Sequence, residues 1–146
     1  RIQEEQMGEA EFVIVGKDPV ERVRRLEQES NITVTGAVAD VRPYMAASTV
    51  YVAPLRMGGG TRFKIMEAMA LQSAVVTTTV GMEGFNVMNG RELIIADSPS
   101  EQADQILYLL DDQERRKQLG QAARIFVEQT CDWSIILSAV ENLYYS

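Results

Sequence analysis

The sequence predicts an α/β protein with a Rossmann-like parallel sheet of five or six strands and helices on both faces. Two observations lead to this fold class. Short apolar, β-branched segments alternate with longer segments of helical period, a pattern that is typical of βαβ units. Glycines also follow the first four apolar segments, at Gly16, Gly36, Gly58–Gly60 and Gly81, where loops would gather at one edge of a parallel sheet.

EFVIVG (Glu11–Gly16) shows the strand pattern most clearly. A continuous apolar run that ends at glycine is typical of a strand in a parallel sheet, buried on both faces. The later strands repeat this pattern in shorter form. The expected strands are Glu11–Gly16, Asn31–Thr35, Thr49–Ala53, Ala74–Thr77 and Glu92–Ala96.

Side chains that cap helices precede the helical segments. Asp18-Pro19 has the order of an N-cap and a first helical residue, and Ser98 to Glu101 has the spacing of a capping box, with proline at its second position. The expected helices are Val20–Gln28, a short helix from Asp40 to Ala47, Thr61–Leu71, Ser98–Leu110, Asp112–Gln129 and Asp132–Leu143.

Composition limits the class of protein. The 146 residues, 46% hydrophobic and 24% charged, fit one globular domain (1–146). The chain has no histidine, which excludes a histidine base and the common zinc sites, and its net charge of −7 argues against a nucleic-acid partner. A single cysteine favours a reducing, cytoplasmic compartment. The longest apolar runs are too short for a transmembrane segment, and the start RIQEEQ, without Met, suggests a piece of a longer protein.

The most distinctive segment is VAPLRMGGGTRFKIMEAMA, from Val52 to Ala70. Its spacing does not fit a P-loop, because Lys64 follows Phe63 instead of glycine. A helix that starts near Thr61 would still present free backbone N–H groups and a positive dipole end to an anion. Gly58–Gly60 would let a ligand approach the backbone, and Arg56, Arg62 and Lys64 add positive charge. A diphosphate is the expected ligand; a glycine turn flanked by solvated basic residues is the alternative.

Glu67 stands in an otherwise apolar helix that is expected to be buried nearly all round. A buried carboxylate needs a partner or a cleft. About 9 Å from the helix start, at 1.5 Å per residue, Glu67 is placed to accept hydrogen bonds from the hydroxyls of a ligand whose phosphates lie at that end. The alternative is a surface pair with Lys64, three residues earlier.

These segments carry a family resemblance. YVAPLRMGGGTRFKIMEAMA followed by VVTTTVGMEG resembles the nucleotide-binding half of GT-B glycosyltransferases of the GT4-like group (glycosyl transferases group 1). ITVTGAVADVRPYMAASTVYVAPL and LLDDQERRKQLGQAAR extend the resemblance over nearly the whole chain. It implies the C-terminal, donor-binding half of a two-domain enzyme, which transfers sugar from a UDP- or GDP-sugar to an acceptor with retained configuration. Its partner would be an N-terminal acceptor-binding domain that carries most catalytic residues, and through which the enzyme could lie at the inner face of a membrane.

The resemblance also implies roles for individual residues. Glu67 would bind the donor ribose, Gly58, Gly59, Gly60 and Thr61 with Arg62 and Lys64 would receive the diphosphate, and Gly36 and Val38 would flank the base. No cofactor or metal is implied beyond the donor substrate. The sequence departs from the family pattern at Gly59, where a first glutamate often stands, and at Gln72 and Ala74, where glycine and proline are common. The fragment alone is expected to be inactive.

Two other readings stay open. A sugar-nucleotide epimerase half-domain shares the GT-B architecture but depends on catalytic carboxylates and histidines that this chain does not show. A non-catalytic flavodoxin- or receiver-like binding module has the same alternation of strands and helices. Receivers, however, need an acidic cluster after the first strand, and EFVIVGKD supplies only Asp18 there.

Overall fold

The computed structural model describes residues 10–58, 62–132, 134, 135, 137 and 141. The chain divides into two compact units, Arg1–Tyr44 and Met45–Ser146. Each unit is described by itself below. The helix α3 (Arg42–Ala47) spans the boundary between them.

The first unit contains a two-stranded parallel sheet. β1 (Phe12–Ile14) pairs with β2 (Ile32–Val34) so that Phe12 lies opposite Ile32. Between the strands, α2 (Glu21–Arg24) continues into the 3-10 helix η1 (Arg25–Gln28), which contacts both α2 and β2. The strand, helix and strand expected in this region are therefore confirmed, but the prediction that the first strand is buried is wrong, because Phe12 and Val13 are 48% and 39% exposed.

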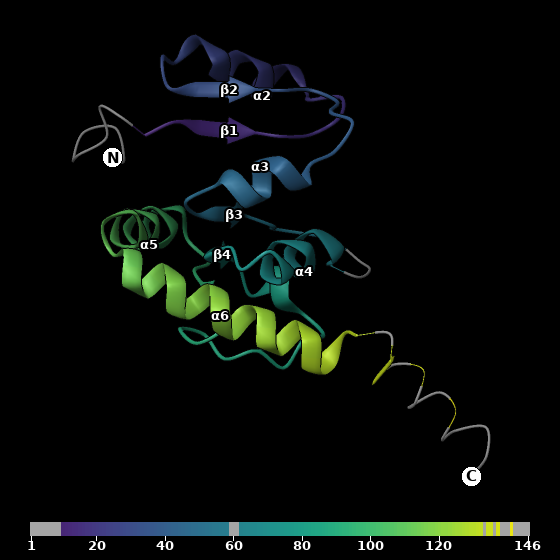
Figure 1. Ribbon diagram of the computed structural model, residues 1–146. Coiled ribbons are helices and arrows are strands. Elements are labelled where there is room, and N and C mark those ends of the chain that lie inside the picture. Colours follow the sequence, from purple (N-terminus) through teal and green to yellow (C-terminus); the bar gives the residue numbers. More distant parts are fainter. Residues whose placement is uncertain (1–9, 59–61, 133, 136, 138–140, 142–146) are drawn as a thin grey trace. The chain divides into compact units, whose positions relative to one another are not determined.

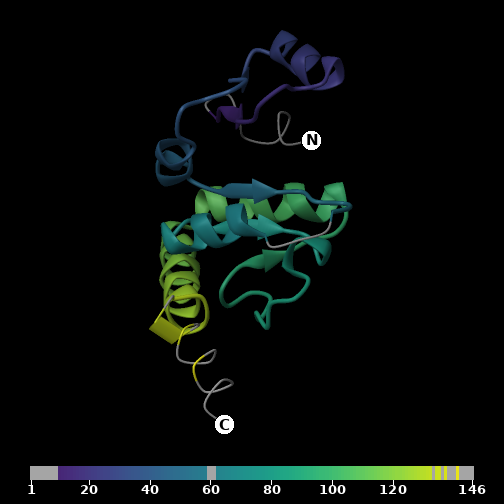
Figure 2. The ribbon, with the colours of Figure 1, turned by 90° about the vertical axis from the view of Figure 1, so that its right-hand side faces the viewer.

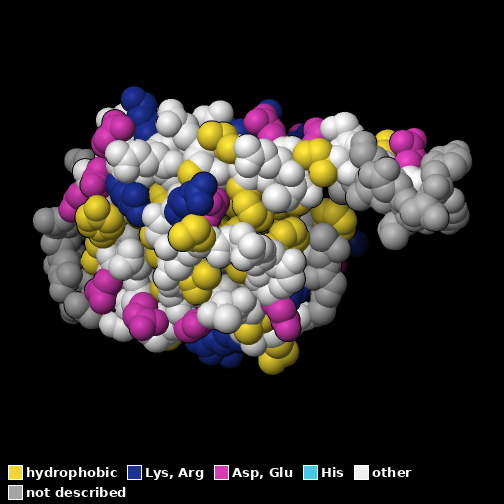
Figure 3. Space-filling model, turned by 90° about the horizontal axis from the view of Figure 1, so that it is seen from below, with side chains coloured by type: hydrophobic (Ala, Val, Ile, Leu, Met, Phe, Trp, Pro, Cys, Tyr) yellow, Lys and Arg dark blue, Asp and Glu magenta, His cyan; other side chains and the backbone are white. Residues whose placement is uncertain are grey.

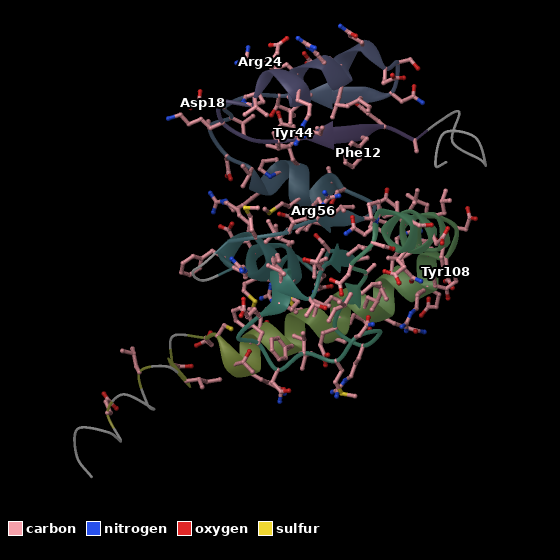
Figure 4. All side chains as sticks on the ribbon, turned by 180° about the vertical axis from the view of Figure 1, so that it is seen from behind. Phe12, Asp18, Arg24, Tyr44, Arg56 and Tyr108 are labelled. Atoms are coloured by element: carbon pink, nitrogen blue, oxygen red, sulfur yellow. The ribbon has the colours of Figure 1, made fainter. Side chains whose placement is uncertain are left out.

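The predicted cap of the first helix is wrong. α2 begins at Glu21 after Val20, whose backbone is extended and which makes no side-chain cap. Asp18 instead has φ +49°, a left-handed conformation that aspartate tolerates better than most residues. Asp18 thus turns the chain before Pro19, and the Pro19 carbonyl accepts a hydrogen bond from Arg24 Nε at 3.1 Å. Figure 4 labels Asp18 and Arg24.

The second unit contains a three-stranded parallel sheet with the order β3-β4-β5. β3 (Tyr51–Ala53), β4 (Val75–Thr77) and β5 (Ile94–Ile95) are each shorter than expected by one or more residues at their ends. The 3-10 helix η2 (Val80–Met82) follows β4. The long connection from η2 to β5 then loops out below the strands (Figure 2).

Three helices complete the second unit. α4 (Phe63–Ala70) and α5 (Pro99–Asp111) both contact β4, and α6 (Gln113–Thr130) packs against both helices (Figure 1). The capping box at the start of α5 is confirmed: the Glu101 backbone N–H donates to Ser98 Oγ at 3.2 Å, and the Ser98 N–H donates to Glu101 Oε2 at 2.9 Å. Asp112 caps α6 by accepting from the Arg115 N–H at 2.8 Å. Most of the helix expected from Asp132 to Leu143 lies outside the described residues.

The core of the second unit lies between its sheet and its helices. Six buried apolar side chains form one cluster: Ala74, Val76, Ile94, Ala96, Leu109 and Leu119. On the face seen in Figure 3, apolar side chains gather near the middle and acidic side chains lie mostly around them. Among the described residues, no helix is long and apolar enough to cross a membrane.

The parallel α/β fold class is confirmed, but the described strands pair as two sheets of two and three strands instead of one. The apolar pattern of a strand marks its position without specifying which strand lies beside it.

A second correction concerns α4, which was expected to be buried nearly all round. Phe63 is 68% exposed and Leu71 is also exposed, so the helix buries one face and not its whole circumference.

Candidate functional site

The carboxyl ends of β3, β4 and β5 form the candidate site, because parallel strands end at the same edge of their sheet. Residues 54–58 follow β3 at this edge, residues 78–83 follow β4, and Asp97 follows shortly after β5. All of them belong to the second unit. Gly59, Gly60 and Thr61 of the predicted site lie outside the described residues.

Threonine hydroxyls connect the ends of β3 and β4. Thr77 Oγ1 donates to the Ala53 carbonyl at 2.9 Å, and Thr78 Oγ1 donates to the Leu55 carbonyl at 2.5 Å. Both threonines are buried. The Thr78 hydroxyl also accepts from the Gly81 backbone N–H at 3.1 Å. The start of the segment after β3 is therefore held to the segment after β4.

Thr79 makes the corresponding connection to the end of β5. Its backbone N–H donates to Asp97 Oδ1 and its hydroxyl donates to Asp97 Oδ2, both at 2.8 Å. These hydrogen bonds, the backbone one first, lower the pKa of the Asp97 carboxyl below its usual value because they stabilise the charged form. Three consecutive threonines thus join the ends of all three strands.

Arg62 reaches across the same edge. Its Nη2 donates to the Gly58 carbonyl at 2.7 Å, and its Nε and Nη2 donate to the Val80 carbonyl at 3.3 and 3.1 Å. The side chain is only 8% exposed, while Glu83 Oε2 lies 4.0 Å from Nη2 on a largely exposed side chain. The guanidinium of Arg62 is thus buried mainly against backbone carbonyls.

Lys64 and Glu67 form an ion pair on α4. Lys64 Nζ lies 2.8 Å from Glu67 Oε2, with the two side chains 61% and 41% exposed. The requirement that Glu67 have a partner is therefore met by the surface pair that the sequence left open as an alternative. Burial, and secondly the charge of Glu67, raise the pKa of the Tyr51 hydroxyl. Tyr51 on β3 therefore lies within electrostatic range of this carboxylate.

The start of α4 differs slightly from the expectation. The helix begins at Phe63, with Arg62 at the N-cap position and no side-chain cap. The Arg62 carbonyl accepts from the Ile65 and Met66 N–H groups at 3.0 and 3.1 Å. Because no side chain among the described residues caps it, this helix end keeps the electrostatic character that favours an anion.

Gly36 and Val38, predicted to flank the base, lie in the first unit. Gly36 has φ +68° and follows β2, where the Thr35 N–H donates to the Ile14 carbonyl at 3.0 Å. Val38 is partly buried. A site shared by these residues and the glycine loop of the second unit stays a prediction.

The structure brings together Gly58 with Arg62, and Lys64 with Glu67. Sequence reasoning missed the contributions of Thr77–Thr79, Val80 and Asp97. The run of three threonines at the end of a predicted strand was the available signal, since threonine hydroxyls readily bond neighbouring backbone groups. A shallow groove lined by Gln72, Gln121, Arg124, Ile125 and Glu128 lies at the other end of α4 and includes none of the predicted site residues.

Comparison with known proteins identifies the family. The family model described as glycosyl transferases group 1 matches residues 1–112. The chain therefore belongs to the glycosyl transferases group 1 family, and the predicted resemblance is confirmed.

A curated relative is the GDP-mannose-dependent monoacylated alpha-(1-6)-phosphatidylinositol monomannoside mannosyltransferase of Corynebacterium glutamicum. It is 28% identical over 150 residues, which cover 94% of this chain and 39% of the relative. This chain thus spans about two fifths of the relative's length.

Solved structures show the same fold. HepE of Anabaena in complex with UDP has a TM-score of 0.78 at 20% identity, over 94% of this chain and 41% of HepE. Sucrose-phosphate synthase of Thermosynechococcus elongatus has a TM-score of 0.78 at 22% identity, over 99% of this chain and 39% of the synthase. These likenesses place the chain in the GT-B fold.

Proposed function

We propose that this chain is the donor-binding domain of a glycosyltransferase, which transfers a sugar from a UDP- or GDP-sugar to an acceptor. The observation that carries the proposal is the family match over residues 1–112, which includes the whole segment after β3 and α4. The chain spans only 39% of the C. glutamicum relative. We therefore propose that an N-terminal acceptor-binding domain completes the enzyme, and that this chain alone binds donor without transferring sugar.

The names of the relatives support the choice of donor. The C. glutamicum relative is GDP-mannose-dependent, and a HepE structure contains UDP. GDP-mannose and UDP both contain a nucleoside diphosphate, so their shared chemistry is a ribose joined to two phosphates. We carry over this class to the present chain and leave the base and the sugar open.

The proposed phosphate seat is the uncapped start of α4 with the glycine run before it. Exposed Arg56 (labelled in Figure 4) and Lys64 bring positive charge to the segment around it. Helix-end N–H groups and cations stabilise the negative charge that develops on a leaving diphosphate. This is the contribution that a donor domain makes to glycosyl transfer. Retention of configuration is proposed from the family alone.

Glu67 is the proposed ribose ligand. Its side chain is 41% exposed, and Lys64 Nζ lies 2.8 Å from its Oε2. A carboxylate has about four lone-pair sites, so one ammonium partner leaves it able to accept from ribose hydroxyls. Gly36 and Val38 are proposed to flank the base. The complete enzyme is proposed to be cytoplasmic and to reach a membrane surface through its other domain.

Titration of the 146-residue chain with UDP, GDP and ADP by calorimetry or NMR tests the proposal. Dissociation constants at or below the millimolar range for UDP or GDP are expected. Failure of all three nucleotides to bind would overturn the donor-binding function.

Glu67→Gln tests the ribose assignment separately. The variant should lose, by about tenfold, the preference of the chain for the ribonucleotide over its 2′-deoxy form. Glu128→Gln is the matched control, because Glu128 is also ion-paired on a helix, to Arg124 at 2.5 Å. An unchanged preference in Glu67→Gln would refute the ribose role and leave nucleotide binding intact.

A further inference from the structure

We propose that Arg62 is a positioning residue that clamps Gly58, where the glycine run begins, to the segment after β4, and that it is not a ligand of the donor phosphates. The inference rests on the proposed function, because it assigns a role within the same site. Its basis is that the guanidinium is nearly buried and turned toward the carbonyls of Gly58 and Val80.

The contacts of Arg62 differ from those expected of a phosphate-binding arginine in a ligand-free site. A phosphate-binding arginine presents two parallel N–H donors to the ligand. Here Nη2 donates to both carbonyls at 2.7 and 3.1 Å, and Nε adds a 3.3 Å bond to Val80. Burial of a cation is costly unless its donors find acceptors. Two backbone carbonyls from different segments supply acceptors for Nε and Nη2.

Arg62 is the second side chain that holds the segment after β3, because Thr78 holds the same segment at Leu55. Thr78 holds the Leu55 carbonyl at 2.5 Å, and Arg62 holds the Gly58 carbonyl three residues later. Gly58 has φ +141°, a conformation that residues with a side chain rarely adopt. The segments after β3 and β4 are thereby joined into one piece at the point where the glycine run begins.

A backbone segment that is held at Leu55 and Gly58 before the ligand arrives gives up less conformational entropy on binding. The clamp therefore contributes to diphosphate affinity without touching phosphate. The positive charge that meets the phosphates comes from elsewhere, and Lys64 and Arg56 are exposed cations of the same segment.

Replacement of Arg62 by lysine separates the two roles. Lysine keeps the charge but lacks the planar fork that reaches both carbonyls. In a clamp, Arg62→Lys should weaken binding of the nucleoside diphosphate about tenfold, nearly as much as Arg62→Met. Affinity for the corresponding monophosphate should change less, because the loop is proposed to hold the diphosphate. General destabilisation would weaken both nucleotides alike.

Arg124→Lys is the matched control. Arg124 Nη1 donates to the Ala70 carbonyl at 2.6 Å, so it makes the same type of bond at the opposite end of α4. This variant should bind both nucleotides like the wild-type chain. NMR order parameters of the nucleotide-free variants add a second readout: those of Gly58 and Val80 should fall in Arg62→Lys and stay unchanged in Arg124→Lys.

The possible results are distinguishable. Wild-type affinity in Arg62→Lys together with a loss in Arg62→Met would show that charge matters, and would make Arg62 a phosphate ligand. Unchanged order parameters in Arg62→Lys would also overturn the clamp. If the wild-type chain binds neither UDP nor GDP, the proposed function fails and the donor-positioning role fails with it, while the order parameters still decide whether Arg62 holds the loop.

Discussion

The two units of this chain differ in how completely they cover their own apolar surface. Within residues 10–44 of the first unit, no side chain is buried, and Phe12 on β1 is 48% exposed (Figure 4). In the second unit, Leu109 and Leu119 are fully buried in a cluster shared by the sheet and the helices. Both units are built from the same parallel βαβ pattern, so the pattern alone does not determine burial.

The difference teaches where stability resides. A two-stranded sheet is marginal in water by itself, whereas three strands packed on helices can sustain a core. We therefore expect the free energy of unfolding to depend mainly on the second unit, which also holds the strand-end edge of the candidate site.

The strongest test of this comparison uses two leucines. Leu109→Ala removes a fully buried side chain from the core of the second unit and should cost about 2–5 kcal/mol of unfolding free energy. Leu26→Ala in η1 removes a side chain that is already partly exposed, and should cost less than about 1 kcal/mol. Urea unfolding of both variants measures the difference. Equal losses would contradict the assignment of stability to the second unit.

A pair of glycines gives the next largest effect. A Cβ at Gly120 on α6 would lie 2.1 Å from the Gln72 carbonyl oxygen, so Gly120→Ala must push α6 away from the turn after α4. We expect a loss of about 1–3 kcal/mol, despite the better helix propensity of alanine.

Gly16 in the first unit is the control for this prediction. A Cβ there meets nothing within 4 Å, so Gly16→Ala should change the unfolding free energy by no more than about 0.5 kcal/mol. Thermal or urea unfolding measures both changes. A harmless Gly120→Ala would show that α4 and α6 can separate more easily than their contact suggests.

Much of the fold followed from local sequence signals. Ser98 and Glu101 form the capping box that their spacing predicted, because a capping box involves only neighbouring residues. The cap predicted at Asp18 failed because the spacing of Asp18 and Pro19 does not specify the backbone conformation of Asp18. Asp18 adopts a left-handed conformation, which depends on the turn around it. The division into two sheets was not predictable, because strand pairing depends on contacts between distant segments.

The candidate site was predictable in its location and less so in its contacts. The glycine run and Glu67 pointed to the segment after β3, and Lys64 was recognised as a possible partner from its spacing on the helix. Arg62 was expected to contact phosphate, whereas its described contacts are the carbonyls of Gly58 and Val80. The acceptor at Val80 is 18 residues away in sequence, and no periodic pattern indicates it.

Gln72 offers a smaller test, in the stabilising direction. It follows α4 with φ +60°, and the Ser73 and Gln72 N–H groups donate to the carbonyls of Ala68 and Met69, as in a Schellman motif. Glycine adopts this conformation without strain but is more flexible in the unfolded chain. Gln72→Gly should therefore stabilise the second unit by about 0.5 kcal/mol. Gln72→Ala keeps the strain and should give no gain in urea unfolding; an equal gain would attribute the effect to loss of the glutamine side chain.

The smallest expected effect concerns the exposed carboxylate of Asp97, which accepts hydrogen bonds from Thr79 at the carboxyl ends of the strands. Hydrogen bonds from Thr79 lower the pKa of Asp97. The stabilising contribution of the Asp97 carboxylate is therefore complete above the usual aspartate pKa and is lost as the pH falls through the lowered value.

Thr79→Ala removes the hydroxyl donor, although it keeps the backbone N–H. The pKa of Asp97 should then rise partway toward its usual value, and the unfolding free energy should depend less on pH in this acid range. An NMR titration of the carboxyl groups measures the shift, with Asp132 as the internal control because hydrogen bonds from Ser134 lower its pKa and neither Thr79 nor Asp97 contributes. An unchanged pKa of Asp97 would mean that the backbone N–H alone holds the end of β5 to the segment after β4. A matching rise for Asp132 would instead indicate a change throughout the second unit.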